Sequence, residues 1–180
     1  MSAPSSPRKF NLTASAQAGQ PASGRTGLVE LPRLCADLDL SGSPAKPIGW
    51  QAQVEQREIA SGPPQLWLHL RAQAHLPMSC QRCLKPAEQE VQVDRWFRFV
   101  ESEEVAEAED DDSEEDLLVF EPQFDLLALL EDELLLDLPL VPMHGSCPQP
   151  PVLTQPDGLE LAAEKPHPFA ALAQLKKKSS

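Results

Sequence analysis

The sequence has few aromatic residues and no long apolar stretch. Aromatic residues make up 5% of the 180 residues, and tyrosine is absent. So few large side chains, together with 19 prolines, predict a modest core with long irregular connections rather than a compact enzyme with a large interior. No apolar run approaches the roughly 18 residues of a membrane-spanning helix, so we expect no integral membrane protein. The N-terminus also lacks the apolar stretch of a secretory signal, which favours a cytoplasmic location.

Motifs of common catalytic sites are absent as well. There is no G-x-S-x-G turn, no H-E-x-x-H and, with 8 glycines in the whole chain, no glycine-rich phosphate loop. The neighbouring acids Glu131, Asp132 and Glu133 are more typical of a solvated helix face than of an acid–base pair. The sequence therefore predicts a protein without enzymatic activity.

Basic residues are missing from one long part of the chain. Residues 101–137 hold 17 of the 28 acidic residues and no Lys or Arg, whereas the rest of the chain has a net charge of +4. The overall charge of −13 therefore does not exclude an anionic partner. The most acidic part, residues 101–116, repels itself and offers little apolar surface to bury, which predicts a disordered, solvated loop. An alternative hypothesis is that this loop mimics RNA and covers a basic surface until RNA binds.

Alternating apolar residues predict a long β-hairpin in the middle of the chain. Apolar residues occupy every second position from Leu66 to Leu76, which is typical of a strand with one buried face. The alternation returns between Val91 and Phe99. These two strands predict a hairpin whose wide tip is formed by residues 77–87.

The segments before the hairpin carry weaker signals. Residues 1–27 are rich in Ser, Ala, Pro and Gly, which predicts a flexible N-terminal segment. Residues 28–42 predict a short strand or extended segment, and a further strand is expected from Trp50. We therefore expect one domain over residues 28–178.

Leucines at helical spacing predict one amphipathic helix after the acidic loop. They recur along one face between Leu126 and Leu138, with Asp125 as the expected N-cap and Phe124 as a hydrophobic staple. Pro139 ends the helix. A short C-terminal helix is expected from Pro168. The predicted fold class is α+β, with an antiparallel, strongly curved sheet or partly open barrel, one leucine-rich helix and a short C-terminal helix.

Two pairs of metal-ligating residues lie far apart in the sequence. Cys80 and Cys83 form a C-x-x-C in the predicted hairpin tip, and His144 and Cys147 form an H-x-x-C after the leucine-rich helix. Two tight turns that each supply two N or S ligands are typical of a tetrahedral zinc site, so we predict a structural zinc ion. Alternatively, the C-x-x-C is a redox pair, or the cysteines are small hydrophobic residues and His144 a surface residue. Cys35 is expected to be buried.

The order of these motifs resembles a known family. The resemblance rests on C-Q-R-C-L from Cys80, the acidic stretch, a leucine-rich segment ending in L-P-L-V-P-M-H at His144, and a terminal P-H-P-F-A-A-L followed by lysines. This series resembles the bacterial YceD family, also called the large ribosomal RNA subunit accumulation protein family, over residues 28–178. The resemblance implies a small cytoplasmic protein without enzymatic activity, linked to the synthesis, processing or stability of 23S ribosomal RNA.

Basic residues near the hairpin and at the C-terminus are candidate RNA contacts. Their side chains would bind phosphates, and an exposed tryptophan would stack on an unpaired base. Alternatively, the arginines are solvated strand residues and the tryptophan belongs to the core. The candidates are Arg82, Lys85, Arg95, Trp96, Arg98, Lys176, Lys177 and Lys178.

The partner of the protein is open at this stage. The leading hypothesis is contact with 23S rRNA or its precursor, directly or through a ribosomal or assembly protein. The second is a protein–protein adaptor that docks a basic ribosomal protein or assembly factor through the acidic loop and the leucine-rich helix. A thiol oxidoreductase that uses Cys80 and Cys83 is the third.

Overall fold

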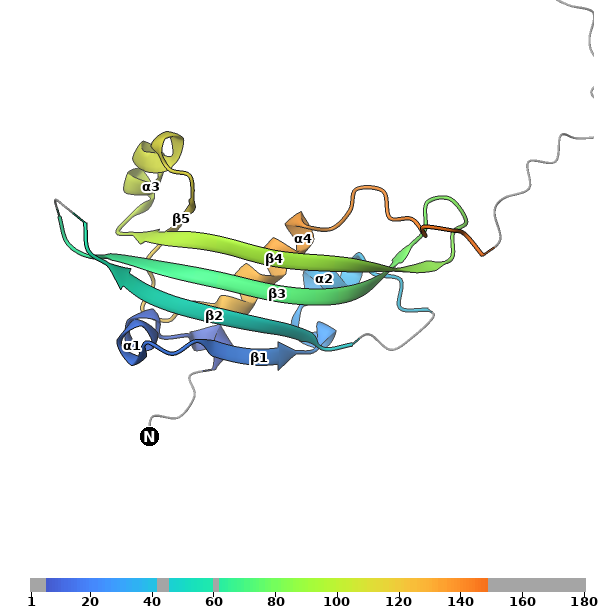
Figure 1. Cartoon of the computed structure of the whole chain (residues 1–180), viewed down its shortest axis with the longest axis horizontal. Coiled ribbons are helices and arrows are strands. Elements are labelled where there is room, and N and C mark those ends of the chain that lie inside the picture. The colour runs from blue at the N-terminus through green and yellow to red at the C-terminus, as the bar shows by residue number, and fades with distance from the viewer. Residues whose placement is uncertain (1–5, 42–45, 60–61, 149–180) are drawn as a thin grey trace, which may run out of the picture. The chain divides into compact units, whose positions relative to one another are not determined.

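The computed structural model describes residues 6–41, 46–59 and 62–148, which form a mixed α+β unit around one five-stranded sheet (Figure 1). The strands are β1 (Ala22–Thr26), β2 (Ile48–Arg57), β3 (Gln65–Ser79), β4 (Pro86–Val100) and β5 (Asp116–Val119), in this order across the sheet. The helices are η1 (Pro7–Lys9), α1 (Leu12–Ala18), η2 (Leu28–Glu30), α2 (Pro32–Ala36), α3 (Glu103–Glu109), η3 (Asp110–Asp112) and α4 (Leu126–Leu136). The predicted α+β class is confirmed. The C-terminal helix expected from Pro168 lies outside the described residues.

The long hairpin is confirmed. β3 and β4 pair antiparallel from Leu66 opposite Phe99 to Ser79 opposite Pro86. Alternate residues of β3 point to the same face, and Leu68, Leu70 and Leu76 on that face are fully buried. Burial of this apolar row sets the register, because a slip by one residue would expose all of it.

The sheet is not closed, and one of its strands is parallel. β1 to β4 pair antiparallel as expected, but β5 runs parallel to β4, with Phe97 opposite Asp116 and Val100 opposite Val119. β1 and β5 are the two edges of the sheet and do not pair with each other. The expectation of an entirely antiparallel sheet is therefore wrong. A parallel neighbour requires the chain to cross back along the sheet, and the segment with α3 and η3 makes this crossover.

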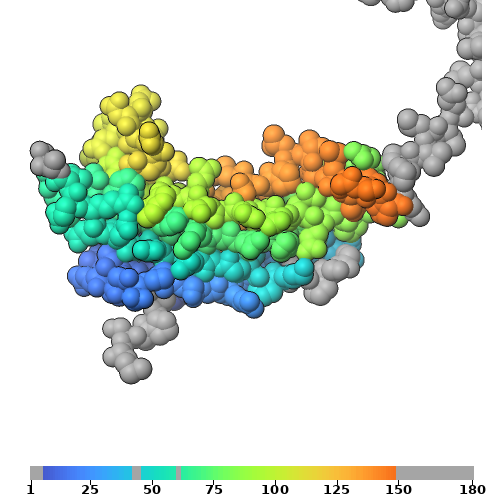
Figure 2. Space-filling model, in the orientation of Figure 1, coloured from blue at the N-terminus to red at the C-terminus, as the bar shows by residue number. Residues whose placement is uncertain are grey.

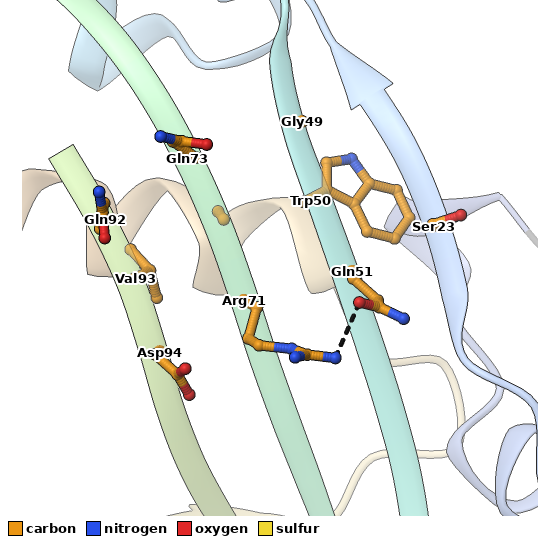
Figure 3. A pocket seen from close by; sticks show the side chains of 10 residues that line it. Ser23, Gly49, Trp50, Gln51, Arg71, Gln73, Gln92, Val93 and Asp94 are labelled. Atoms are coloured by element: carbon orange, nitrogen blue, oxygen red, sulfur yellow. Dashed lines mark hydrogen bonds between the residues drawn. The ribbon is translucent and has the colours of Figure 1, made fainter. Parts of the chain in front are cut away.

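α2 and α4 lie on one face of the sheet (Figure 1), and the core fills the space between this face and the helices. The fully buried leucines of α4, including Leu126, Leu130 and Leu134, pack in one cluster with the apolar face of β3. The opposite face, which we call the open face, carries polar side chains. Among them the guanidinium of Arg71 donates a 2.9 Å hydrogen bond to Gln51 (Figure 3).

The N-terminal segment differs from the expected flexible chain. Residues 6–27 contain a helix and an edge strand, and the backbone of Phe10 exchanges hydrogen bonds of 2.8 and 3.1 Å with that of Phe124. Asn11 caps α1 by accepting a 2.8 Å bond from the backbone N–H of Ala14. Phe10 is buried and Leu12 is fully buried, so two apolar side chains anchor a segment that is otherwise polar and small.

Residues 28–41 form two helical turns rather than the expected strand. The apolar residues Leu28, Leu31 and Leu34 are spaced by three, and all three are buried. This spacing puts them on one side of a helical segment, whereas a strand would point them to opposite faces. Pro32 favours the same outcome, because proline suits the first position of a helix. Cys35 is half-buried rather than buried.

The most acidic part of the chain, residues 101–116, which we call the acidic window, is largely helical. This differs from the expected disordered loop. α3 and η3 occupy residues 103–112, and the segment is tied to the sheet by the Arg98 side chain. The Arg98 guanidinium donates to Glu109 at 2.7 Å, to Glu115 at 2.6 Å and to the Ser113 hydroxyl at 2.8 Å. One buried cation therefore offsets part of the repulsion between the acids.

α4 begins as expected. The carboxylate of Asp125 accepts a 3.0 Å bond from the backbone N–H of Ala128, which confirms it as the N-cap. However, Glu131 and Glu133 are buried, so the expectation of a solvated acidic face is wrong for these two residues.

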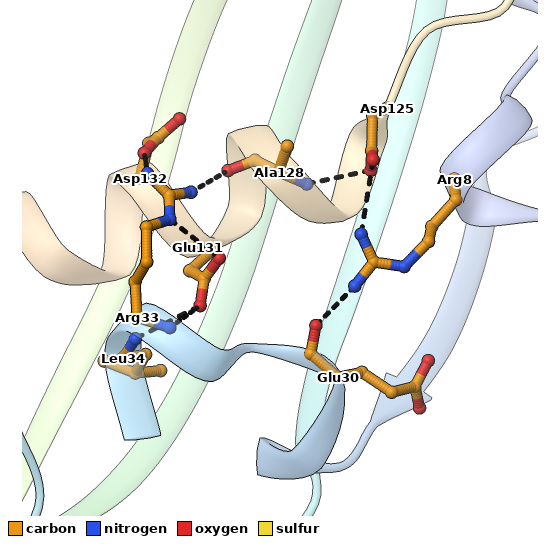
Figure 4. A network of polar contacts seen from close by, with 8 residues as sticks. All are labelled: Arg8, Glu30, Arg33, Leu34, Asp125, Ala128, Glu131 and Asp132. Atoms are coloured by element: carbon orange, nitrogen blue, oxygen red, sulfur yellow. Dashed lines mark hydrogen bonds and ion pairs between the residues drawn. The ribbon is translucent and has the colours of Figure 1, made fainter. Parts of the chain in front are cut away.

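Glu131 joins α4 to the N-terminus of α2 (Figure 4). Its carboxylate accepts hydrogen bonds from the backbone N–H groups of Arg33 at 2.7 Å and Leu34 at 3.1 Å, and from the Arg33 guanidinium at 3.0 Å. The side chain thus satisfies amides that the first turn of a helix leaves unpaired.

We expect the substitution Glu131→Ala to lower the free energy of unfolding by about 1–3 kcal/mol, because it leaves the backbone N–H groups of Arg33 and Leu34 without their acceptor. Urea denaturation followed by circular dichroism would measure this. The control is Asp132→Ala, which removes an ion pair whose partners are about half exposed and should cost less than ~1 kcal/mol. Equal losses for both variants would contradict this role of Glu131.

The buried carboxyl of Glu133 should make the stability of the protein depend on pH. Burial raises the pKa of Glu133 above its ordinary 4.5, and Arg95, with 3.7 Å between the charged groups, offsets only part of this effect. The folded state therefore favours the neutral carboxyl, and ionisation costs stability as the pH rises. We expect Glu133→Gln to raise the urea midpoint at pH 7 and to give no gain below pH 4.5. A gain in the urea midpoint that is equal at both pH values would contradict this. Glu30→Gln, at an exposed residue, is the control and should change the midpoint little at either pH.

Candidate metal centre

The tip of the β3–β4 hairpin is a tight loop that holds two cysteines. The backbone N–H of Cys80 donates to the carbonyl of Lys85 at 2.9 Å, and that of Leu84 donates back to Cys80 at 2.8 Å. Leu84 has a φ of 57°, in the left-handed region. This conformation costs a residue with a Cβ roughly 1–2 kcal/mol, so the loop is held by the contacts around it.

The chain after α4 packs against this tip. The carbonyl of Pro142, a buried residue, accepts a 2.9 Å bond from the backbone N–H of Gln81, and the carbonyl of Met143 accepts a 3.2 Å bond from the Gln89 side chain. These contacts bring the H-x-x-C segment to the C-x-x-C loop.

The four predicted ligands come together. One ligand atom from each of Cys80, Cys83, His144 and Cys147 lies within 4.8 Å of all the others. The Sγ atoms of Cys80 and Cys147 are 3.8 Å apart, and Cys83 Sγ is 3.4 Å from His144 Nδ1. Sulfurs bound tetrahedrally to one zinc ion at ~2.3 Å would lie ~3.8 Å apart, so the cluster has the dimensions of a metal site.

His144 is oriented as a metal ligand requires. Its Nε2 donates a 3.0 Å hydrogen bond to the carbonyl of Pro86, which assigns the ring proton to Nε2. Nδ1, the nitrogen that faces Cys83, then carries the free lone pair. A backbone carbonyl that holds the distal ring nitrogen is a common support for a ligating histidine.

The thiols differ in acidity. Burial opposes ionisation of Cys80, but backbone N–H groups of His144 and Cys83 outweigh it and lower the pKa of the Cys80 thiol from 9.0 to about 5. Burial and the nearby Cys83 and Cys80 sulfurs raise the pKa of Cys147. A stabilised thiolate at Cys80 is a ready ligand for a divalent cation, which would displace the proton of Cys147 on binding.

The redox alternative fits this geometry less well. In thioredoxin-like proteins the C-x-x-C lies at the start of a helix, whereas here it joins two strands. The third sulfur, from Cys147, and the imidazole of His144 make the group a ligand set rather than an isolated pair.

Two predicted RNA contacts are exposed at the hairpin tip. Arg82 lies between the two cysteines and Lys85 follows them, and an Arg82 guanidinium nitrogen lies 3.8 Å from the sulfur of Met143. Both cations would therefore be positioned by the same loop that a metal would hold. Lys176, Lys177 and Lys178 lie outside the described residues.

The arginines of β4 are already paired with acids. Arg98 has a side chain that is only 8% exposed, and it binds Glu109 and Glu115, so its guanidinium does not face an RNA partner. Arg95 is exposed but lies 3.7 Å from Glu133 and 3.8 Å from Asp116. Of these two arginines, Arg95 has the exposed side chain, and its contact with RNA stays a prediction.

Trp96 belongs to a half-buried cluster on the open face rather than to the core. Its ring stacks on His69 with a centroid distance of 4.2 Å and an interplanar angle of 8°. The guanidinium of Arg57 lies 4.3 Å from the Trp96 ring and 4.0 Å from the Trp67 ring. Sequence analysis did not single out Arg57, because its place beside the tryptophans depends on the register between β2 and β3. Base stacking on Trp96 stays a prediction.

The leucine-rich helix does not offer the surface that the adaptor hypothesis requires. Most leucines of α4 are buried in the core, and Leu136, at 74% exposed, is the exception near its C-terminal end. Of the two surfaces in the adaptor hypothesis, the acidic residues 101–116 are the one that stays exposed for a partner.

No helix among the described residues has the length and hydrophobicity needed to cross a membrane.

Comparison with solved structures finds no match. Comparison with curated proteins finds a relative from Haemophilus influenzae, "Large ribosomal RNA subunit accumulation protein YceD", that is 37% identical over 119 residues, or 60% of this chain and 64% of the relative. The match thus spans less than two thirds of the relative's length. The family described as "Large ribosomal RNA subunit accumulation protein YceD" matches residues 68–176, more than half of the chain, from near the start of β3 past the four ligands. The chain therefore belongs to the YceD family.

Proposed function

We propose that this protein is a cytoplasmic, non-enzymatic factor in the accumulation of large-subunit (23S) ribosomal RNA, and that a structural zinc ion holds its hairpin tip. The first part is supported by the name of the family and of the relative from H. influenzae. The second is supported by one observation, the convergence of four ligand atoms within 4.8 Å.

Zinc is the metal that best fits this donor set. Three thiolates and one imidazole are soft to borderline ligands, which favour zinc over magnesium or calcium. Four protein ligands complete a tetrahedron and leave no open position for a water or a substrate, which is typical of a structural rather than a catalytic site. The ion would supply a cross-link and no reaction step.

The cross-link would matter because of where the ligands lie. Cys83 and His144 are separated by 61 residues, so the ion closes a long loop. It joins the hairpin tip to the segment that follows α4. The exposed cations at the tip, Arg82 and Lys85, would then be presented on a rigid loop to phosphate groups, either of the rRNA itself or of an rRNA–protein assembly.

We expect the purified protein to contain about one zinc ion per chain, measured by elemental analysis, and a chelator to lower its melting temperature. Cys80→Ser should lose most of the zinc because it removes one of the four ligands. His144→Cys should retain the zinc, since Cys₄ sites are equally suitable. Cys35→Ser, outside the cluster, is the matched control. Wild-type protein that contains no zinc and is unaffected by zinc addition would contradict the proposal.

RNA contact through the tip predicts a change in the salt dependence of binding. The double variant Arg82→Ala/Lys85→Ala should bind fragments of large-subunit rRNA more weakly, because each lost phosphate contact removes about 0.7–0.9 from the log–log salt slope. Lys9→Ala/Arg25→Ala removes two exposed cations elsewhere and should leave the slope unchanged. Filter binding at several salt concentrations would measure both. An unchanged slope in the tip variant would mean that Arg82 and Lys85 do not contact the RNA.

A further inference from the structure

A groove of about 610 Å³ lies at the opposite end of the sheet from the cysteine cluster. Its walls come from α1, the end of β2, the start of β3, the end of β4, α3 and the chain after β5. These segments are far apart in the sequence and meet only because β3 and β4 carry the chain back from the hairpin tip (Figure 1). None of the predicted metal ligands lies near this groove.

The groove is largely apolar. Its wall includes the buried Phe99 and the half-buried Leu66 and Val105. Ile59 and Phe120 also line it and are 37% and 38% exposed, so two large apolar side chains remain accessible to solvent. A concave apolar surface of this size is typical of a binding site rather than of scattered surface residues.

The rim of the groove is acidic. Glu101 and Glu109 line it, and α3, which forms one wall, carries further exposed glutamates, of which Glu107 lines a separate hollow on another side of the helix. Figure 2 shows α3 as a projection above this end of the sheet. Arg98 is the lone cation among the lining residues, and its guanidinium is already bound by Glu109 and Glu115.

Charge decides which partner fits. The sequence contains no Lys or Arg from residue 99 to residue 148, so acids dominate the groove and the segment around it. An RNA backbone would be repelled by this rim, whereas Lys and Arg side chains would be attracted to it. The apolar floor requires large apolar side chains in the same ligand.

We propose that this groove docks a protein segment in which large apolar side chains are flanked by Lys or Arg. The apolar side chains contact Ile59 and Phe120, and the cations pair with Glu101 and Glu109 on the rim. This inference goes beyond the proposed function, since it assigns a protein partner to a second site. β3 and β4 have 15 residues each, so at ~3.3 Å per residue the groove lies roughly 45–50 Å from the hairpin tip. Both ends can be occupied at the same time.

The test uses fluorescent peptides and the full-length protein. The probe is a 14-residue synthetic peptide of Lys, Leu and Phe, with one matched peptide in which Glu replaces Lys and another in which Ser replaces Leu and Phe. Fluorescence anisotropy at low and high salt measures the affinities. We expect the probe to bind at least tenfold more tightly than either matched peptide, because the site requires both charge and apolar contact.

Two sets of variants locate the binding site. Ile59→Ser/Phe120→Ser should weaken binding of the probe about tenfold, and Val29→Ser, at an apolar residue that is 89% exposed elsewhere, should not. Glu101→Lys should weaken binding and reduce its salt dependence, whereas Glu30→Lys, at an exposed acid elsewhere, should have little effect. Circular dichroism and melting curves verify that each variant is folded.

The outcomes separate this proposal from the proposed function. If both groove variants bind the probe as the wild type does, or if the Ser-containing peptide binds equally well, the groove is not the docking site. If the groove variants instead lose affinity for large-subunit rRNA fragments, the groove is an RNA site and the proposal is wrong. If they lose the peptide and keep the RNA, while Arg82→Ala/Lys85→Ala does the reverse, the two sites are independent and the proposal holds.

Discussion

The pairing of β3 with β4 is the constraint on which the rest of the structure depends. The ladder runs without a break from Leu66 opposite Phe99 to the cysteine loop, and its register is set by one buried apolar row. This pairing places the C-x-x-C loop at one end of a long ribbon and the acidic segment that follows β4 at the other. The two candidate sites are therefore separated by the length of the strands, and each is built on a rigid end of the same hairpin.

Buried charged side chains attach the peripheral segments to this hairpin. Glu131 of α4 binds the first amides of α2, and Arg98 of β4 binds the carboxylates of the acidic window. In each case a group that is costly to bury is satisfied by several partners at once. The sheet and α4 thereby hold short elements such as α2 and α3, which are too short to be stable alone.

The four candidate ligands lie beside a segment with several exposed apolar side chains. The segment from Pro139 to Cys147 contains several exposed apolar residues, among them Leu140, fully exposed, and Val141 at 56%. It contacts the tip through the backbone bond from Gln81 to Pro142, the side-chain bond from Gln89 to Met143 and the close approach of the four candidate ligands. A small core with few aromatics gains more from a cross-link at such a place than from further apolar contacts. An ordered tip and an acidic groove would give the protein one site for phosphate and another for basic protein, which suits a factor acting on an RNA–protein assembly.

Much of the fold was determined by local sequence patterns. Period-two alternation identifies β3 and β4, and leucine spacing and Asp125 identify α4, because each signal depends only on residues near one another. The C-x-x-C and H-x-x-C motifs identify the candidate ligands, but only the folded chain brings the two pairs together. The parallel pairing of β5, the order of residues 101–116 and the helical turns of α2 were decided by tertiary structure. Arg33 and Glu131 are 98 residues apart, and Arg98 meets acids that lie beyond a crossover. The charged residues in a sequence are expected to lie in solvent. Only the folded chain shows that Arg33 pairs with the buried Glu131, and that acids of the acidic window pair with the buried Arg98.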